Sequence, residues 1–166
     1  MATTDNLKEA FAGESQANRR YLAFAKQAAA EGHPGIARLF RAAAEAETVH
    51  AHAHLRVMGG VKSTADNVRA AIAGEHYEFT EMYPGFLAEA DSEGNQDAVM
   101  SFKNALAVEE IHHRLYNDAL KALGGGGDLP MARFFVCGVC GNTVTGAPPD
   151  KCPIYSSPRE KFSEVA

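Results

Sequence analysis

Glu109-Glu110-Ile111-His112 is the stretch that decides the fold of this chain. On a helix, Glu109 and His112 lie three residues apart and therefore on one face. The same spacing recurs at Glu47-Thr48-Val49-His50, and Glu75-His76-Tyr77-Glu78 carries two carboxylates at that spacing. A further segment offers Glu14 alone. Four helical segments that each offer Glu, two of them with His three residues on, are typical of a di-iron or di-manganese carboxylate site inside a four-helix bundle.

The bulk properties narrow the class of protein. A chain of 166 residues is long enough for one substantial core and a small appendage. The formal charge of −5 argues against nucleic acid and against an anionic membrane surface as partners. No apolar stretch is long enough to span a bilayer, and the N-terminal residues do not form a secretory signal. Three cysteines, all after residue 136, make no disulfide framework, so we expect a cytoplasmic protein.

Helical periodicity and turn residues predict four helices. The first covers about 6–31 after a cap at Thr3, Thr4 or Asp5, and the second covers about 36–58. The third starts from a cap at Ser63 or Thr64 and ends at 92–95, and the fourth covers about 96–123. Pro84 lies inside the third helix and predicts a kink there, because proline disrupts a helix interior.

The helices contain an internal repeat, which predicts two duplicated hairpins. Ala12-Gly13-Glu14 recurs as Ala73-Gly74-Glu75, and Glu47 and His50 recur as Glu109 and His112. Phe40 recurs as Phe102, with the same separation along the chain as the two Glu-x-x-His motifs. The separation of Glu14 and Glu75 is one residue shorter. Glu78 corresponds to Ala17, so one half offers an extra carboxylate and the two metal positions should differ.

The composition changes after Gly124–Gly127, which we interpret as a flexible linker. We therefore expect a bundle domain over 1–123, a linker over 124–130 and a second domain over 131–166. In the second domain, a short strand at 134–136 leads into Cys137-Gly138-Val139-Cys140, and Cys152 follows later. So small a segment has too few apolar residues for a core of its own, and a bound metal is the usual substitute.

Each glutamate taken alone is most simply explained as a solvated helix position. That explanation fails for the set, because Glu14 and Glu75 lie on apolar stripes, where an unpaired charge is costly. Carboxylate and imidazole ligands suit iron or manganese. Tyr21 and Tyr116 either hydrogen-bond to a ligand or pack in the core, and His76 and His113 should point to solvent. For His54 we favour a supporting or a surface position.

Several blocks occur in an order that resembles the rubrerythrin family over nearly the whole chain: Phe11-Ala-Gly-Glu-Ser-Gln-Ala17, Glu47-x-x-His50, Gly74-Glu75-His76-Tyr77-Glu78, Thr80-Glu81-Met82-Tyr83-Pro84 and Glu109-x-x-His112. The resemblance implies an all-α four-helix bundle of the ferritin-like type with a small C-terminal rubredoxin-like β/loop domain. It implies a di-iron enzyme that reduces hydrogen peroxide to water in oxidative-stress defence. NAD(P)H would supply the electrons through external carriers such as a rubredoxin or its reductase. It further implies a homodimer in which the rubredoxin-like site of one subunit serves the di-iron site of the other.

The resemblance also implies roles for individual residues. Two irons would be held by a set of carboxylates and imidazoles, namely Glu14, Glu47, His50, Glu75, Glu78, Glu109 and His112. Within this set, His50 would exchange with Glu78 when the iron changes its redox state. Tyr21 and Tyr83 would be the phenols that support the site.

The C-terminal domain departs from the family pattern at one position. The family's second cysteine pair reads C-P-x-C, whereas here the sequence is Cys152-Pro153-Ile154-Tyr155. A rubredoxin iron takes four sulfurs, and this chain offers Cys137, Cys140 and Cys152. We therefore expect an incomplete site that holds iron, zinc or no metal, and impaired electron delivery.

Two other classes of function compete with this interpretation. A ferritin-like iron-binding protein or ferroxidase would consume O₂ and store or detoxify iron. A binding or electron-transfer module would use the bundle only as a scaffold, and that reading leaves the seven aligned ligands unexplained.

Overall fold

The structure is a computed structural model that describes residues 2–130 and 133–165. Contacts divide the chain into two compact units, Met1–Lys62 and Ser63–Ala166. The domain boundary that the sequence suggests at 124–130 stays a prediction, since the second unit includes the last long helix together with the C-terminal strands.

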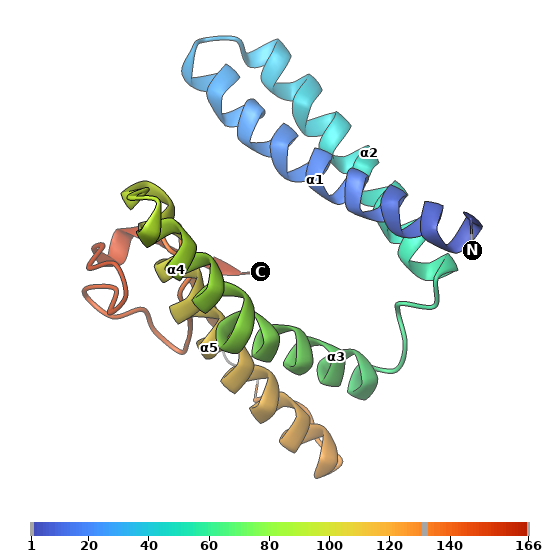
Figure 1. Ribbon diagram of the computed structural model, residues 1–166, viewed down its shortest axis with the longest axis vertical. Coiled ribbons are helices and arrows are strands. Elements are labelled where there is room, and N and C mark those ends of the chain that lie inside the picture. The colour runs from blue at the N-terminus through green and yellow to red at the C-terminus, as the bar shows by residue number, and fades with distance from the viewer. Residues whose placement is uncertain (1, 131–132, 166) are drawn as a thin grey trace. The chain divides into compact units, whose positions relative to one another are not determined.

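The first unit is a helical hairpin formed by α1 (Ala2–Ala30) and α2 (Pro34–Val57), which run side by side in Figure 1. Small residues let the two helices approach closely: the buried positions include Ala25, Ala37 and Ala44. Asn18, also buried, donates from Nδ2 to the Ala44 carbonyl at 2.7 Å and to the Thr48 hydroxyl at 2.8 Å. A buried amide that is satisfied in this way holds the hairpin in one register.

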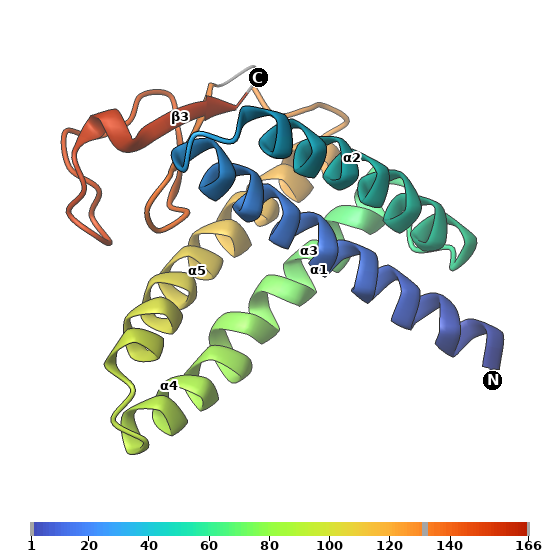
Figure 2. The same cartoon turned by 90° about the horizontal axis from the view of Figure 1, so that it is seen from above.

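The second unit begins with three consecutive helical segments, α3 (Thr64–Tyr77), the π-helix η1 (Glu78–Met82) and α4 (Tyr83–Ser92). The Ser63 hydroxyl accepts from the Asp66 N–H at 3.2 Å and caps α3, as predicted. These segments contact α5 (Gln96–Gly124), which starts at the Asn95 cap. In Figure 2, α4 and α5 lie next to each other and meet at one end of the second hairpin.

The π-helix η1 explains why the sequence repeat changes its offset. The separation of Glu14 and Glu75 along the chain is one residue shorter than that of Tyr21 and Tyr83. A π-turn takes one extra residue into a helix, and η1 lies between Glu75 and Tyr83. The Tyr83 N–H bonds to the Glu78 carbonyl, five residues back, as this geometry requires.

The two helical hairpins contain equivalent clusters of aromatic rings. Each hairpin has three aromatic rings in mutual contact, and the pairwise distances between ring centroids run from 5.5 to 6.4 Å. The first cluster is Tyr21, Phe24 and Phe40, and the second is Tyr83, Phe86 and Phe102. All three rings of the second cluster have the same offset from their counterparts in the first, which supports a duplicated hairpin.

Two local predictions need correction. Helix α1 already includes Thr3, Thr4 and Asp5, so the prediction that one of them caps it was wrong. The irregularity expected at Pro84 is the π-helix immediately before it, and Pro84 itself occupies the first turn of α4. A proline is tolerated there because its missing N–H is not needed in a first turn.

The C-terminal part is a small antiparallel sheet in the order β2-β1-β3. Its strands are β1 (Phe134–Cys137), β2 (Thr143–Thr145) and β3 (Phe162–Val165), with a 3₁₀ turn at Arg159–Lys161. Its core is very small and consists of Phe135, Phe162 and two cysteines, Cys137 and Cys152. A domain with so small an apolar core usually needs a further source of stability, such as a bound metal.

The predicted fold class is confirmed: the chain is helical, with a small C-terminal strand region around a cysteine cluster. Within residues 2–130 and 133–165, no helix is both long and apolar enough to cross a membrane.

Candidate metal centre

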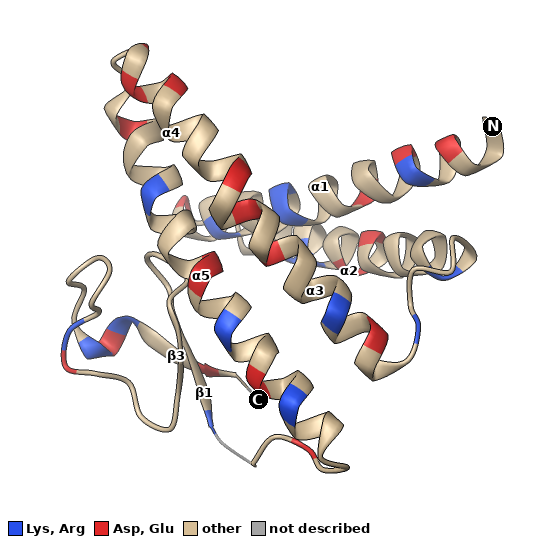
Figure 3. Cartoon of the chain, turned by 60° about the horizontal axis from the view of Figure 1, so that its bottom comes forward, with Lys and Arg blue, Asp and Glu red and all other residues tan. Residues whose placement is uncertain are grey.

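The second unit brings Glu75 of α3 together with Glu109 and His112 of α5. One donor atom from each of the three residues lies within 4.8 Å of the other two. Nδ1 of His112 is 2.8 Å from an oxygen of Glu109 and 3.9 Å from an oxygen of Glu75. All three side chains are half-buried. Acidic positions along α3 and α5 are red in Figure 3.

The electrostatics of this group favour a cation. Burial, together with the neighbouring Glu109 carboxylate, raises the pKa of Glu75 to about 7. Burial and the same Glu109 charge also raise the pKa of Glu78, at the start of η1, while His112 opposes that shift. Carboxylates that repel one another in a partly buried place are neutralised either by protons or by a metal ion.

Tyr83 stands close to these carboxylates. Burial and then the charges of Glu109, Glu78 and Glu75 raise the pKa of its phenol, so the hydroxyl keeps its proton. The η1 segment, which separates Glu78 from Tyr83, is the kind of helix irregularity that is frequent at functional sites.

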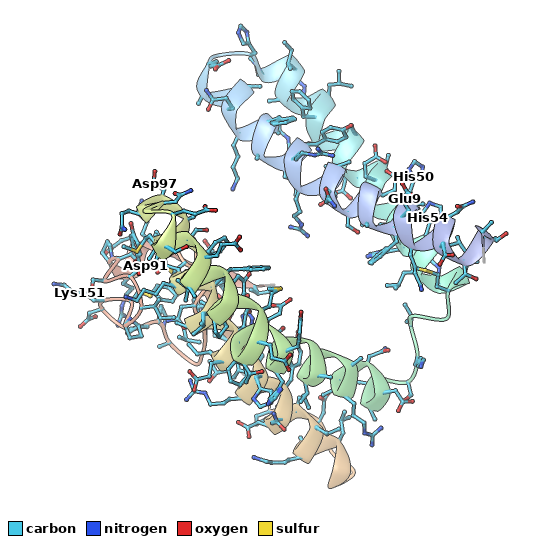
Figure 4. The ribbon with its side chains drawn as sticks, in the orientation of Figure 1. Glu9, His50, His54, Asp91, Asp97 and Lys151 are labelled. Carbon is cyan, nitrogen blue, oxygen red and sulfur yellow. The ribbon has the colours of Figure 1, made fainter. Side chains whose placement is uncertain are left out.

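The first unit holds the matching group. Glu14 of α1 and Glu47 and His50 of α2 also place one donor atom each within 4.8 Å of one another. Nδ1 of His50 lies 2.9 Å from Glu47, although the His50 side chain is 55% exposed. Figure 4 shows His50 and His54 one turn apart on α2. Tyr21 packs against Phe24 and Phe40.

The structure thus arranges six of the seven predicted ligands in two groups of three. Glu78 is not part of either group, although its charge interacts with Glu109 and His112. The assignment of all seven as ligands stays a prediction. His76, exposed, and His113, half-buried, form a ring cluster with Phe79.

Thr143, a residue that sequence reasoning missed, orients His112. Its hydroxyl donates to the Gly141 carbonyl at 3.2 Å and lies 2.9 Å from Nε2 of His112. Without a metal, Nδ1 of His112 lies 2.8 Å from Glu109 and can donate to that carboxylate. When Nδ1 binds a metal ion instead, the Thr143 hydroxyl is placed to accept from Nε2–H. A hydrogen bond of this kind to the second ring nitrogen commonly fixes the orientation of a metal-binding imidazole.

A cavity of about 560 Å³ in the second unit borders this group. Glu75, His112 and Thr143 line it on the polar side, and Leu115, Leu129 and Phe134 contribute apolar surface. A cavity of this size can admit small molecules to the carboxylates.

The C-terminal sheet gathers a second candidate site. The sulfurs of Cys137, Cys140 and Cys152 lie within 4.8 Å of one another, and the last two are 3.5 Å apart. Burial alone would raise the pKa of Cys137, but hydrogen bonds from Ser157 and from the backbone of Cys140 and Val139 lower it to about 7. Burial raises the pKa of Cys140 to about 12.

Three thiolates do not fit the four-sulfur iron of a rubredoxin. Tyr155, at the position of the fourth thiolate, is 45% exposed. A buried residue, Ser157, which the sequence analysis also missed, instead touches Cys137. Its spacing of five residues from Cys152 matches no standard ligand pattern, so the sequence alone gave no signal for it.

Comparisons with known proteins show which family the chain resembles in sequence and fold. The sequence profile of the family described as Rubrerythrin matches residues 5–120. Rubrerythrin-2 of Clostridium acetobutylicum is 33% identical, with 96% of this chain and 95% of that protein covered. Nigerythrin of Nitratidesulfovibrio vulgaris is 35% identical, with 98% and 86% covered. A solved structure of fully reduced, all-ferrous nigerythrin matches 98% of this chain and 86% of that chain, at 33% identity and a TM-score of 0.59.

Proposed function

Because the chain belongs to the rubrerythrin family of di-iron oxidoreductases, which serve in oxidative-stress defence, we propose that it reduces hydrogen peroxide to water. The observation that carries the proposal is the group of Glu75, Glu109 and His112. It combines two crowded carboxylates with an imidazole whose Nδ1 points at them. We propose that seven side chains bind the two irons. They are this group, its counterpart of Glu14, Glu47 and His50, and Glu78.

Two ferrous ions supply one electron each when bound, and hydrogen peroxide takes up two electrons and two protons to give two water molecules. The protein contributes placement and protons. Tyr83 keeps a proton on its phenol oxygen beside the carboxylates, so it can donate a hydrogen bond there. Thr143 can accept a hydrogen bond from Nε2–H of His112 when Nδ1 binds a metal ion.

An external carrier, such as a rubredoxin or its reductase, would restore the electrons after each turnover, with NAD(P)H as the ultimate source. The family resemblance supports a homodimer as the working form. Three thiols need a reducing compartment, which supports the cytoplasm as the location.

A steady-state assay with a reduced rubredoxin as donor tests the proposal. The protein should consume peroxide, and Glu109→Gln should lose most of this activity together with its iron. Glu110→Gln is the matched control, because Glu110 is the exposed neighbour of Glu109 and should behave like the parent.

The ferritin-like alternative predicts a different outcome of the same experiment. It would show as consumption of O₂ in preference to peroxide, and as growth of an iron mineral when ferrous ion is in excess. That pair of results would replace peroxide reduction with iron oxidation as the function.

A further inference from the structure

The turn after Cys152 exposes one residue and buries another. Tyr155 is 45% exposed, and Ser156 follows in the left-handed region with φ of 55°. This conformation is uncommon for a residue with a side chain. Ser157 comes next and is only 7% exposed. The Cys152 N–H donates to the Ser157 carbonyl at 2.8 Å, which holds Ser157 in place.

The Ser157 hydroxyl contacts one sulfur of the cysteine cluster. Its Oγ lies 3.2 Å from the Sγ of Cys137, and the sulfurs of Cys140 and Cys152 are 3.5 Å apart. Around a tetrahedral zinc ion, with bonds of about 2.3 Å to sulfur and about 2.0 Å to oxygen, two sulfurs are about 3.8 Å apart and an oxygen and a sulfur about 3.5 Å. Both contacts are therefore close to the edges of a metal tetrahedron.

We propose that the C-terminal cluster is a closed metal site of three thiolates and one hydroxyl, in which Ser157 occupies the fourth position that Tyr155 does not fill. Ser157 is buried and contacts Cys137, whereas the phenol of Tyr155 is exposed. Asn142, which is 1% exposed, donates from Nδ2 to the sulfur of Cys152 at 3.6 Å.

Such a site suits a divalent ion, zinc or ferrous iron. Three thiolates and a neutral hydroxyl leave a divalent ion with one negative charge overall, whereas a ferric ion favours a fourth anionic ligand. The site therefore holds the small sheet together, in place of a larger apolar core. This inference does not depend on the peroxide chemistry of the helical site.

Cobalt binding to the full-length protein tests the proposal, because thiolate-to-cobalt absorption reports only on the cysteine cluster. Ser157→Cys should change the spectrum to that of four sulfurs and give a rubredoxin-like visible spectrum with iron. Ser163→Cys is the matched control, since Ser163 is exposed on β3, and it should keep the parent spectrum. Tyr155→Phe should do the same, because it removes only the phenol oxygen.

Ser157→Ala provides a second, independent test. Loss of a ligand should lower zinc affinity at least about tenfold, the loss seen when even an outer partner of a ligand is removed. The open position should then take up a small external thiol such as mercaptoethanol, whereas the parent should not. The proposal is overturned if Ser157→Cys keeps a three-sulfur spectrum, or if Ser157→Ala matches the parent in both affinity and thiol uptake.

Discussion

Nε2 of His112 lies 2.9 Å from the hydroxyl of Thr143, so a residue of the C-terminal sheet orients a proposed iron ligand of the helical bundle. Nearby, Gly141 lies so close to α5 that a Cβ at this position would contact Val108. Gly141 has φ of 84°, a conformation that favours glycine. The segment that contains Cys137 and Cys140 thus lies against α5, the helix that carries Glu109 and His112.

Thr143→Val should weaken iron binding at the helical site. The substitution keeps the shape of the side chain but removes the acceptor for Nε2–H, so His112 is no longer held in the ligating tautomer. We expect affinity to fall about 10–100-fold, as is typical when a partner of a metal ligand is removed. Competition with a chelator measures this, and Thr145→Val, exposed on the same strand, is the control that should not change.

The metal-free protein should lose stability as the pH rises from about 4.5 to about 7. The folded state raises the pKa of Glu75 from 4.5 to about 7, so within this window it binds a proton that the unfolded chain has released. The stabilisation that comes from protonated Glu75 is present in full below about pH 4.5 and is lost above about pH 7. Urea unfolding across the window, in the presence of a chelator, should show a flatter pH profile for Glu75→Gln than for the parent. Identical slopes would exclude this role.

His50 should matter more in the ferrous state than in the ferric state. We propose that it exchanges with Glu78 at one metal, because a carboxylate favours ferric iron and a neutral imidazole favours ferrous iron. Its side chain is 55% exposed and lies 2.9 Å from Glu47. Removal of iron by a chelator should be accelerated more in reduced than in oxidised His50→Gln, with His52→Gln as the control. Equal acceleration in both states would argue against the exchange.

Tyr155→Cys should restore a four-sulfur iron site. The substitution recreates a C-x-x-C after Cys152, equivalent to Cys137 and Cys140, and a thiolate is a softer ligand than a hydroxyl or a phenol. We expect a rubredoxin-like visible spectrum with iron, and faster donor-linked peroxide reduction. If the spectrum and the rate equal those of the parent, Tyr155 does not limit the site.

The sequence predicted the helices and the two Glu-x-x-His motifs because both depend on short-range spacing. The repeat also predicted the duplicated hairpins, and the three-ring clusters agree with it. The π-helix was not predicted, although the increase of the repeat offset by one was its trace in the sequence. Only a backbone hydrogen-bond pattern shows that the extra residue is absorbed as a π-turn rather than as a loop.

The two supporting hydroxyls could not be predicted for a different reason. Thr143 reaches His112 from 31 residues away, and Ser157 reaches Cys137 from 20 residues away. Neither spacing follows a helix or strand period, since each contact depends on how the sheet packs. Contacts of this kind appear only once tertiary structure is known.

We propose that the reduced protein acts as a peroxide reductase. The most direct measurement is a stopped-flow experiment in which anaerobic, fully ferrous protein is mixed with hydrogen peroxide or with O₂. We predict that peroxide oxidises both irons faster than O₂ does, with one peroxide consumed for each pair of irons. Faster oxidation by O₂, or oxidation of one iron for each peroxide with release of radicals, would rule out this function.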